Sequence, residues 1–197
     1  EGCQMDLAQT RYLDYPGLQR YCHLVAGIVG EVTLVIGAAS LVGADGQARQ
    51  VDRGSEVRVG DKVETQQGGH VHLRFVDGGR LSIRPASRLT IENYQHSAGD
   101  SSLSAIKFRL DEGVVRSITG AWGEAARERF RLNTPVAAIG VKGTDFVTQV
   151  SKETIRVTVN QGAIVMAPFD SGCKAEALGV CTTARAKELT AEMLGQA

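Results

Sequence analysis

The chain has 197 residues, of which 43% are hydrophobic, so its length suits one globular domain with appendages and a buried core. Its 22 basic residues equal its 22 acidic residues, and this balance gives no indication of nucleic-acid binding or of an acidic tail. The 23 glycines and the low proline content are typical of a turn-rich folded chain, not of a disordered one.

The first segment, residues 1–29, has the apolar spacing of a helix. Its apolar residues recur at nearly helical intervals, at Leu18, Tyr21, Val25 and Ile28. From Glu31 onward the apolar residues recur at every second position, which is the period of a strand. We therefore predict one N-terminal helical segment followed by a β domain over residues 30–168.

Many short alternating runs, separated by turns that contain Gly and Asp, make up the predicted β domain. The clearest run is HVHLRFVDGGRLSIRP, residues 70–85, in which a turn at Asp77-Gly78-Gly79 joins two strands of a hairpin. The apolar residues of this hairpin face one side, at Val71, Leu73, Phe75, Leu81 and Ile83. The whole pattern predicts a mainly β fold of short antiparallel strands, as a roll, a sandwich or a short β-helix. Residues 169–197 are expected to form a C-terminal loop and a tail whose composition favours a helix.

The outward faces of several predicted strands are cationic. On the hairpin, the basic residues that alternate with the apolar ones are His70, His72, Arg74, Arg80 and Arg84. The same alternation places Lys107, Arg109, Arg127, Arg129 and Arg131 on outward faces. Two interpretations stay open: ordinary protection of strand edges and surface by Lys and Arg, or a local basic face that binds an anionic or acidic partner.

The four cysteines, Cys3, Cys22, Cys173 and Cys181, lack the CxxC spacing of a metal site. In an oxidising compartment we expect a local disulfide between Cys173 and Cys181, because closing this short loop needs little rearrangement. The alternative is a pair of free thiols.

No arrangement of residues predicts an enzyme site. His70 and His72 could reach a metal ion from one face of a strand, but the sequence offers no third ligand. Asp145 and Lys142 lie near each other without a nucleophile in a recognisable turn, and no phosphate-binding glycine loop is present. The apolar run over residues 135–141 is too short to cross a membrane. We therefore expect no catalytic residue, cofactor, metal or membrane span, and no nucleic-acid partner.

From about residue 30 to residue 168 the chain resembles the FecR domain family. Four family blocks occur in order, represented here by GEVTLVIG (30–37), VGDKVETQQGG (59–69), HVHLRFVDGGRLSIRPASRLTI (70–91) and FRLNTPVAAIGVKGTDFVTQV (130–150). The residues that carry the resemblance are Gly37, Gly60, Asp61, Thr65, Asp77, Gly78, Thr134, Pro135, Gly140, Gly143, Thr144 and Phe146. One departure is Lys142, where the family often has Arg, and the positive charge is kept.

The resemblance implies a non-catalytic all-β module that is periplasmic or exported, with its signal peptide outside this chain. Signalling members of the family relay the state of an outer-membrane transporter to a cytoplasmic sigma factor, which implies a protein partner such as the transporter's signalling domain. In the most specific block, Thr134-Pro135 is expected to set the start of a strand. Gly140 and Gly143 are expected to permit a kink, and Phe146 to be buried.

A second resemblance concerns residues 5–32, which are similar to an internal helix of the squalene/phytoene synthase family through YPGLQRYCHLVAGIVG. The chain lacks the DxxxD pairs that hold magnesium and diphosphate in that family, so we do not expect prenyl-transfer activity. The two resemblances meet near residues 30–32, where the apolar period changes. One hypothesis is a composite chain with a chimeric N-terminus, from gene fusion or misassembled sequence; the other is an ordinary N-terminal helix.

The sequence therefore favours a FecR-like envelope module that acts through protein contacts, in cell-surface signalling or sensing linked to sigma-factor regulation. A carbohydrate- or peptidoglycan-binding envelope domain is the alternative, because cationic strands suit an anionic polymer. A remote alternative is an inactive relative of the prenyl transferases that carries only a fragment of them.

Overall fold

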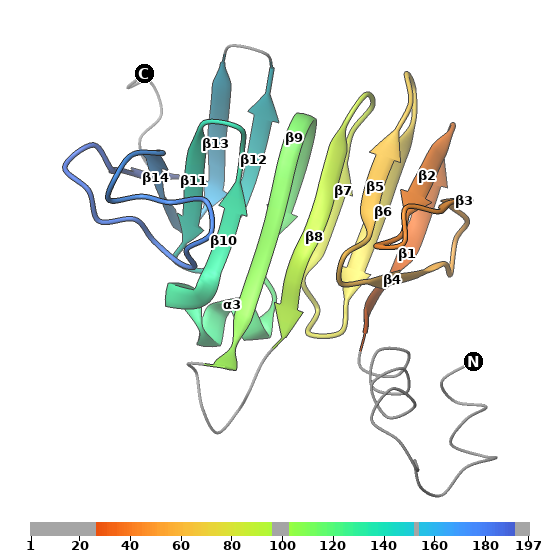
Figure 1. Cartoon of the computed structure of the whole chain (residues 1–197), viewed down its shortest axis with the longest axis horizontal. Coiled ribbons are helices and arrows are strands. Elements are labelled where there is room, and N and C mark those ends of the chain that lie inside the picture. The colour runs from red at the N-terminus through yellow and green to blue at the C-terminus, as the bar shows by residue number, and fades with distance from the viewer. Residues whose placement is uncertain (1–26, 96–102, 152–153, 192–197) are drawn as a thin grey trace, which may run out of the picture.

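The computed structural model describes residues 27–95, 103–151 and 154–191, which form two packed β-sheets (Figure 1). Sheet A contains β1 (Ile28–Ile36), β4 (Glu56–Arg58), β6 (His70–Phe75), β7 (Arg80–Ile83), β12 (Asp145–Val150) and β13 (Ile155–Gln161). Sheet B contains β2 (Ala39–Val42), β3 (Ala48–Gln50), β5 (Lys62–Thr65), β8 (Arg88–Gln95), β10 (Phe130–Asn133), β11 (Ala137–Val141), β14 (Ala163–Pro168) and β15 (Lys187–Thr190). The predicted mainly β fold is confirmed.

The long strand β9 (Ala105–Ile118) belongs to both sheets and joins them. Its first part pairs with β8 and in parallel with β10, and its second part pairs with β7 and β12. The change of sheet falls at Gly113, whose φ of 93° is in the left-handed region. A Cβ at Gly113 would lie 2.1 Å from Oγ of Ser87, so the bend requires glycine.

The strand order explains how distant segments come together. Sheet A runs β4-β1-β6-β7-β9-β12-β13, and sheet B runs β3-β2-β5-β8-β9-β10-β11-β14-β15. Figure 1 shows β1 and β2 at one end of the molecule and β13 and β14 at the other. The short helix α3 (Ala121–Ala125) and the 3-10 turn η2 (Arg127–Arg129) connect β9 to β10.

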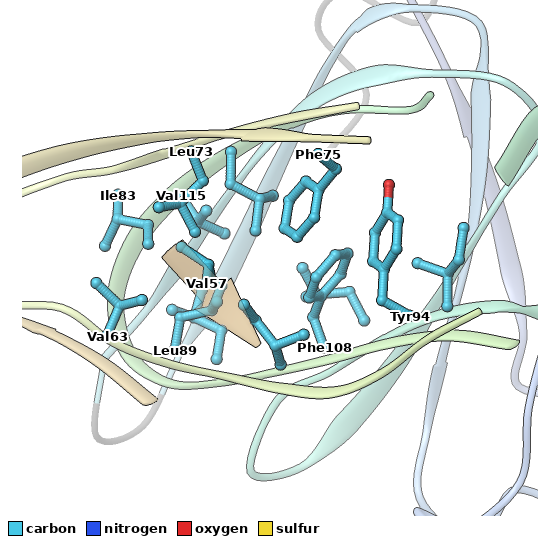
Figure 2. Packing of buried hydrophobic residues seen from close by; sticks show 14 of the residues in the cluster. Val57, Val63, Leu73, Phe75, Ile83, Leu89, Tyr94, Phe108 and Val115 are labelled. Atoms are coloured by element: carbon cyan, nitrogen blue, oxygen red, sulfur yellow. The ribbon is translucent and has the colours of Figure 1, made fainter. Parts of the chain in front are cut away.

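The core lies between the two sheets and is built by the alternation seen in the sequence. The apolar residues of the predicted hairpin, Val71, Leu73, Phe75, Leu81 and Ile83, are all buried. Figure 2 shows Leu73, Phe75 and Ile83 from sheet A facing Val63, Leu89 and Phe108 from sheet B. Burial of each such side chain contributes roughly 1.5–3 kcal/mol, so this interdigitated layer supplies most of the stability that holds the sheets together.

The sequence predicts helical structure near both ends of the chain. The predicted N-terminal helix, together with Cys3 and Cys22, lies outside the described residues. The expectation of a helical C-terminal tail is wrong for residues 187–190, which form β15 and pair with β14 from Lys187↔Met166 to Thr190↔Ala163. The open edge of β14 supplies backbone partners that outweigh the helical propensity of KELT. No helix among residues 27–95, 103–151 and 154–191 is long and apolar enough to cross a membrane.

Candidate functional site

The motif Thr134-Pro135 forms the tight turn between β10 and β11. The Thr134 N–H and hydroxyl both donate to the Ala137 carbonyl at 2.9 Å, and the Ala137 N–H donates back to the Thr134 hydroxyl at 3.0 Å. Pro135 takes the second position of the turn, where its fixed φ suits the backbone. This motif therefore shapes the turn that leads into β11, and Phe146 in β12 is fully buried.

Thr65 has the same kind of role at another corner. Its hydroxyl donates to the Arg84 carbonyl at 2.6 Å and accepts from the Ser87 N–H at 2.9 Å, so it closes the connection from β7 to β8. Gly37, Gly60, Gly78 and Gly143 all have positive φ. At Gly78 this conformation makes the hairpin turn possible between Phe75 and Arg80.

Gly140 departs from the expected role of permitting a kink. It lies inside β11 with φ outside the left-handed region, and it pairs regularly with Val165 of β14. A Cβ at this position would lie 2.7 Å from Cγ2 of Val180. Gly140 therefore allows the C-terminal loop to pack closely against the sheet, while the positive φ of Gly143 (80°) makes the turn that follows.

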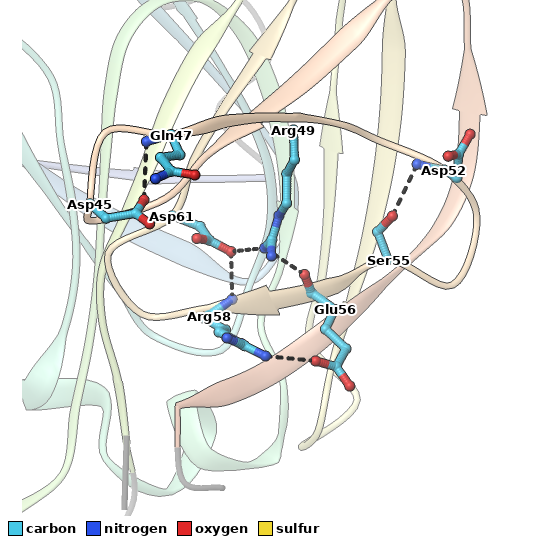
Figure 3. A network of polar contacts seen from close by, with 8 residues as sticks. All are labelled: Asp45, Gln47, Arg49, Asp52, Ser55, Glu56, Arg58 and Asp61. Atoms are coloured by element: carbon cyan, nitrogen blue, oxygen red, sulfur yellow. Dashed lines mark hydrogen bonds and ion pairs between the residues drawn. The ribbon is translucent and has the colours of Figure 1, made fainter. Parts of the chain in front are cut away.

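Asp61 organises the loops around β3 and β4 (Figure 3). Its carboxylate accepts from the Arg58 N–H at 2.9 Å and from Nη2 of Arg49 at 2.8 Å, and Nη2 of Arg49 also donates to the Glu56 carbonyl at 3.0 Å. Burial raises the pKa of Asp61, an effect that the Arg58 N–H and the Arg49 guanidinium oppose. The network therefore ties β3, β4 and the turn before β5 together.

Asp77 connects the hairpin turn to β8 and α3. Its carboxylate accepts from the Tyr94 hydroxyl at 2.5 Å and from the N–H groups of Gly79 and Trp122 at 3.0 Å. Its carbonyl accepts from the Ala121 N–H at 3.1 Å. Tyr94 also stacks on Phe75, with ring centroids 4.3 Å apart. Because the carboxylate is fully used by these structural contacts, Asp77 is a positioning group of the fold.

The predicted basic residues of the hairpin lie on the outer face of sheet A. Arg74, Arg80 and Arg84 are exposed, whereas His70 and His72 are partly buried. Strand pairing extends this face through Arg116 of β9 to Arg156 of β13. We call the side chains of His70, His72, Arg74, Arg80, Arg84, Arg116 and Arg156 the sheet A basic face.

Acidic residues neutralise part of the sheet A basic face. Nη2 of Arg74 lies 2.5 Å from Oε1 of Glu31, and Nε of Arg116 lies 2.8 Å from Oδ1 of Asp145. The Arg116 guanidinium lowers the pKa of Asp145. Within the described part of the chain, Arg80, Arg84 and Arg156 make no ion pair. These three guanidinium groups are therefore the ones available to an external anion.

The two partly buried histidines contact each other. Their Nε2 atoms lie 3.0 Å apart, and Nε2 of His70 is 3.4 Å from Oγ of Ser82. Burial lowers the pKa of both histidines, and the positive charge of Arg84 lowers it further. In the ranges that the structure covers, no cluster of three or more residues could hold a metal ion. The charge of the face near neutral pH thus comes from arginine.

The FecR protein family matches residues 61–165, which is more than half of the chain and includes Asp61, the hairpin and the Thr-Pro motif just described. The chain belongs to the FecR family. A second match, to squalene/phytoene synthase, covers residues 1–56 and confirms the other resemblance. It extends beyond residue 32 through β1, β2 and β3, and two of these strands pair with the FecR-matched part of the sheets: β1 with β6 and β2 with β5. The hypothesis of a composite chain stays a prediction.

Solved structures give weaker likenesses to this FecR domain. A cell surface anchoring domain is 30% identical with a TM-score of 0.30, and the match covers 31% of this chain and 80% of that one. A protein from Parabacteroides distasonis, designated an anti-sigma factor, is 15% identical in each of two crystal structures, with a TM-score of 0.43. Those matches cover 66% of this chain and 50% of the other, so the chain spans half of that protein's length. Among functionally curated proteins no match was found.

The C-terminal loop of this FecR domain, residues 169–186, lies against β11 and β14, where Cys173 and Cys181 pack in one apolar cluster with Ala138 and Ala167. The predicted disulfide between Cys173 and Cys181 is confirmed, with Cα atoms 5.4 Å apart. The loop starts after the region matched by the family, so its position could not be taken from the family motifs.

Arg131 lies on the predicted face of its strand, but its burial was not predicted from the sequence. Its side chain points outward from sheet B, as the alternation predicts, but the C-terminal loop covers it and it is 0% exposed. Nη1 donates to the Gly179 carbonyl at 2.6 Å, Nη2 to the Lys174 carbonyl at 2.8 Å and Nε to Oδ1 of Asn133 at 3.1 Å. Burial lowers the pKa of Arg131. The guanidinium therefore attaches the loop to the sheet through carbonyl groups.

Reducing the disulfide should destabilise the domain by about 2.5 kcal/mol, the chain-entropy value for closing so short a loop. Urea denaturation with and without a thiol reductant, followed by Trp122 fluorescence, measures this loss. The matched control is the Cys173→Ala/Cys181→Ala variant, whose unfolding midpoint should not respond to reductant. Equal midpoints for the oxidised and reduced wild-type protein would contradict the expected contribution of the bridge.

Proposed function

We propose that this FecR domain is a non-catalytic module of the bacterial envelope that acts through protein contacts in cell-surface signalling linked to sigma-factor regulation. Membership of the FecR family supports the signalling context. The motif residues support a structural role without catalysis, because Asp61, Thr65, Asp77 and Thr134 make hydrogen bonds that hold corners of the fold. Such a module would bind its partner through surface residues.

The sheet A basic face is the surface that we assign to the partner. Three of its guanidinium groups, Arg80, Arg84 and Arg156, have no ion pair within the described residues, although the chain as a whole has no net charge. A concentration of unpaired cations on one face favours an acidic surface on the partner and speeds their association. The first partner to test is the signalling domain of an outer-membrane transporter.

The Arg80→Gln/Arg84→Gln variant should bind that signalling domain roughly tenfold more weakly, which corresponds to ~1.4 kcal/mol for two surface charges. Affinity should also fall as salt is raised. The matched control is Arg109→Gln, which removes an exposed arginine from the other sheet and should leave affinity unchanged. Surface plasmon resonance at two salt concentrations measures both effects.

The same variants separate the second candidate, a peptidoglycan-binding domain. The observation that favours it is again the set of unpaired arginines, which would suit an anionic polymer. If wild-type protein sediments with insoluble peptidoglycan and the Arg80→Gln/Arg84→Gln variant does not, the polymer is the ligand. If the signalling domain is retained and peptidoglycan is not, the protein partner is the ligand.

A further inference from the structure

The strand β13 is an open edge of sheet A. Among the described residues it pairs with β12 alone, along Val150↔Ile155 to Asp145↔Gln161. It has seven residues, whereas the other end strands, β4, β3 and β15, have three, three and four. Proteins usually keep edge strands short or cover them, because free backbone groups attract another strand. A long open edge is therefore a feature that needs an explanation.

The register of the β12–β13 hairpin shows which backbone groups are free. The Ser151 N–H donates to the Thr154 carbonyl at 2.9 Å, so residues 151 and 154 form a hydrogen-bonded pair. In an antiparallel ladder such pairs alternate, which makes Gln149↔Arg156 and Val147↔Thr158 the next bonded pairs. The N–H and C=O groups of Ile155, Val157 and Val159 consequently point away from β12, toward the open side.

An apolar groove adjoins this edge. It has a volume of about 530 Å³ and lies between Ile155 of β13 and the β11, β14 and β15 region of sheet B. Its walls are Val136, Ala137, Met166 and Pro168, with Arg185 and Lys187 also lining it. Val136 is exposed to solvent although it is a large apolar residue. The two sheets thus leave apolar surface uncovered next to the backbone groups that lack partners.

We propose that β13 accepts an extended segment of a partner protein as an eighth strand of sheet A. Side chains of an added strand alternate between the two faces of the sheet, so every second one would enter the groove between the sheets. Those positions fit apolar residues. The positions between them fit Asp or Glu, because Arg156 is exposed on the outer face of β13 and Arg185 and Lys187 are exposed beside the groove.

A second copy of this chain fits the same edge less well. The β13 strand of the second copy would bring another Arg156 to the interface. Among the described residues, the groove of that copy is lined by Arg185 and Lys187 and by no Asp or Glu. Like charges that meet in an interface oppose association. The occupant is therefore a segment in which apolar and acidic residues alternate. This inference does not depend on Arg80 and Arg84, which lie on the inner strand β7 and its end.

The test uses a fluorescent peptide of four Val-Glu repeats, blocked at both ends, with a Val-Lys peptide of equal length as its control. Fluorescence anisotropy should show binding of the Val-Glu peptide and at least tenfold weaker binding of the Val-Lys peptide. Amide hydrogen exchange followed by NMR should slow at least tenfold at Ile155, Val157 and Val159 when the Val-Glu peptide is added. Arg156 and Thr158 already bond to β12 and should not change.

Two variants at one position isolate the backbone contribution. Val157→Pro removes an N–H that points to the open side, a place where proline is tolerated in an edge strand, and should abolish peptide binding. Val157→Ala keeps the N–H and should retain binding. The proposal is overturned if the Val-Lys peptide binds equally well, if no exchange slows, or if sedimentation shows a dimer that Val157→Pro abolishes. The Arg80→Gln/Arg84→Gln variant should bind the peptide normally, so failure here is distinguishable from failure of the basic face.

Discussion

Replacing Arg131 by methionine is expected to destabilise the domain by about 3 kcal/mol. The substitution keeps most of the side-chain volume but removes the charged donors for the Gly179 and Lys174 carbonyls, and each such hydrogen bond contributes roughly 1.5–3 kcal/mol. The loss is below the sum of these values because burying the guanidinium has a desolvation cost, which also lowers the pKa of Arg131. Urea denaturation followed by Trp122 fluorescence measures the change.

The local effect of Arg131→Met should be larger than the global one. The loop packs on the sheet through Val180, which touches Gly140, and through the buried disulfide. Without Arg131 these contacts must hold the loop alone, so trypsin should cut after the exposed Lys174 faster than in the wild-type protein. Arg131→Lys keeps the charge but cannot reach three acceptors from one planar group, and it should give an intermediate result. A variant as stable and as protease-resistant as wild type would show that the guanidinium is dispensable.

The burial of Arg131 could not be predicted from the sequence. The alternation in RFRLN placed the side chain on the outer face of a strand, and that placement is right. The local pattern cannot predict that the C-terminal loop covers Arg131, because residues 173–181 lie more than forty positions further along the chain. A sheet face is exposed or buried depending on whether another segment packs over it. The alternation of apolar and polar residues in a strand therefore does not determine whether a charged side chain is exposed.

Elements that follow from the local sequence pattern were predictable. The hairpin at residues 70–83 follows from strict alternation and an Asp-Gly-Gly turn, and its core residues are buried as expected. The family motif residues were found by their pattern, but their contacts were not. Thr65 bonds to Arg84 and Ser87, Tyr94 to Asp77, and Gly140 makes room for Val180. Each of these contacts joins segments that the sequence separates, and the same holds for the open edge of β13.

The Asp77→Ala variant should lose about 3 kcal/mol or more, because one carboxylate serves three donors from three segments. Its removal leaves the buried Tyr94 hydroxyl without its carboxylate acceptor, and an unsatisfied buried polar group costs roughly 1–3 kcal/mol. The Gly79 and Trp122 N–H groups each lose one hydrogen bond as well. The hydroxyl stays neutral as a donor, since burial and the adjacent carboxylate raise the pKa of Tyr94. Asp77→Asn keeps one acceptor oxygen and should lose less than Asp77→Ala.

A double-mutant cycle with Tyr94→Phe identifies how much of that loss belongs to the Asp77–Tyr94 contact. Phenylalanine keeps the stacking on Phe75 and removes only the hydroxyl, so Tyr94→Phe alone should cost about 1–2 kcal/mol. In the Asp77→Ala/Tyr94→Phe protein the Tyr94 hydroxyl is absent and cannot be left unpaired. The combined loss should therefore be at least 0.5 kcal/mol smaller than the sum of the single losses, because residues in contact typically show coupling energies of ~0.5–3 kcal/mol. Additive losses in urea denaturation would mean that the two groups do not interact. A subadditive result would show that the Asp77 carboxylate and the Tyr94 hydroxyl stabilise the fold through one contact, which joins the hairpin turn to β8.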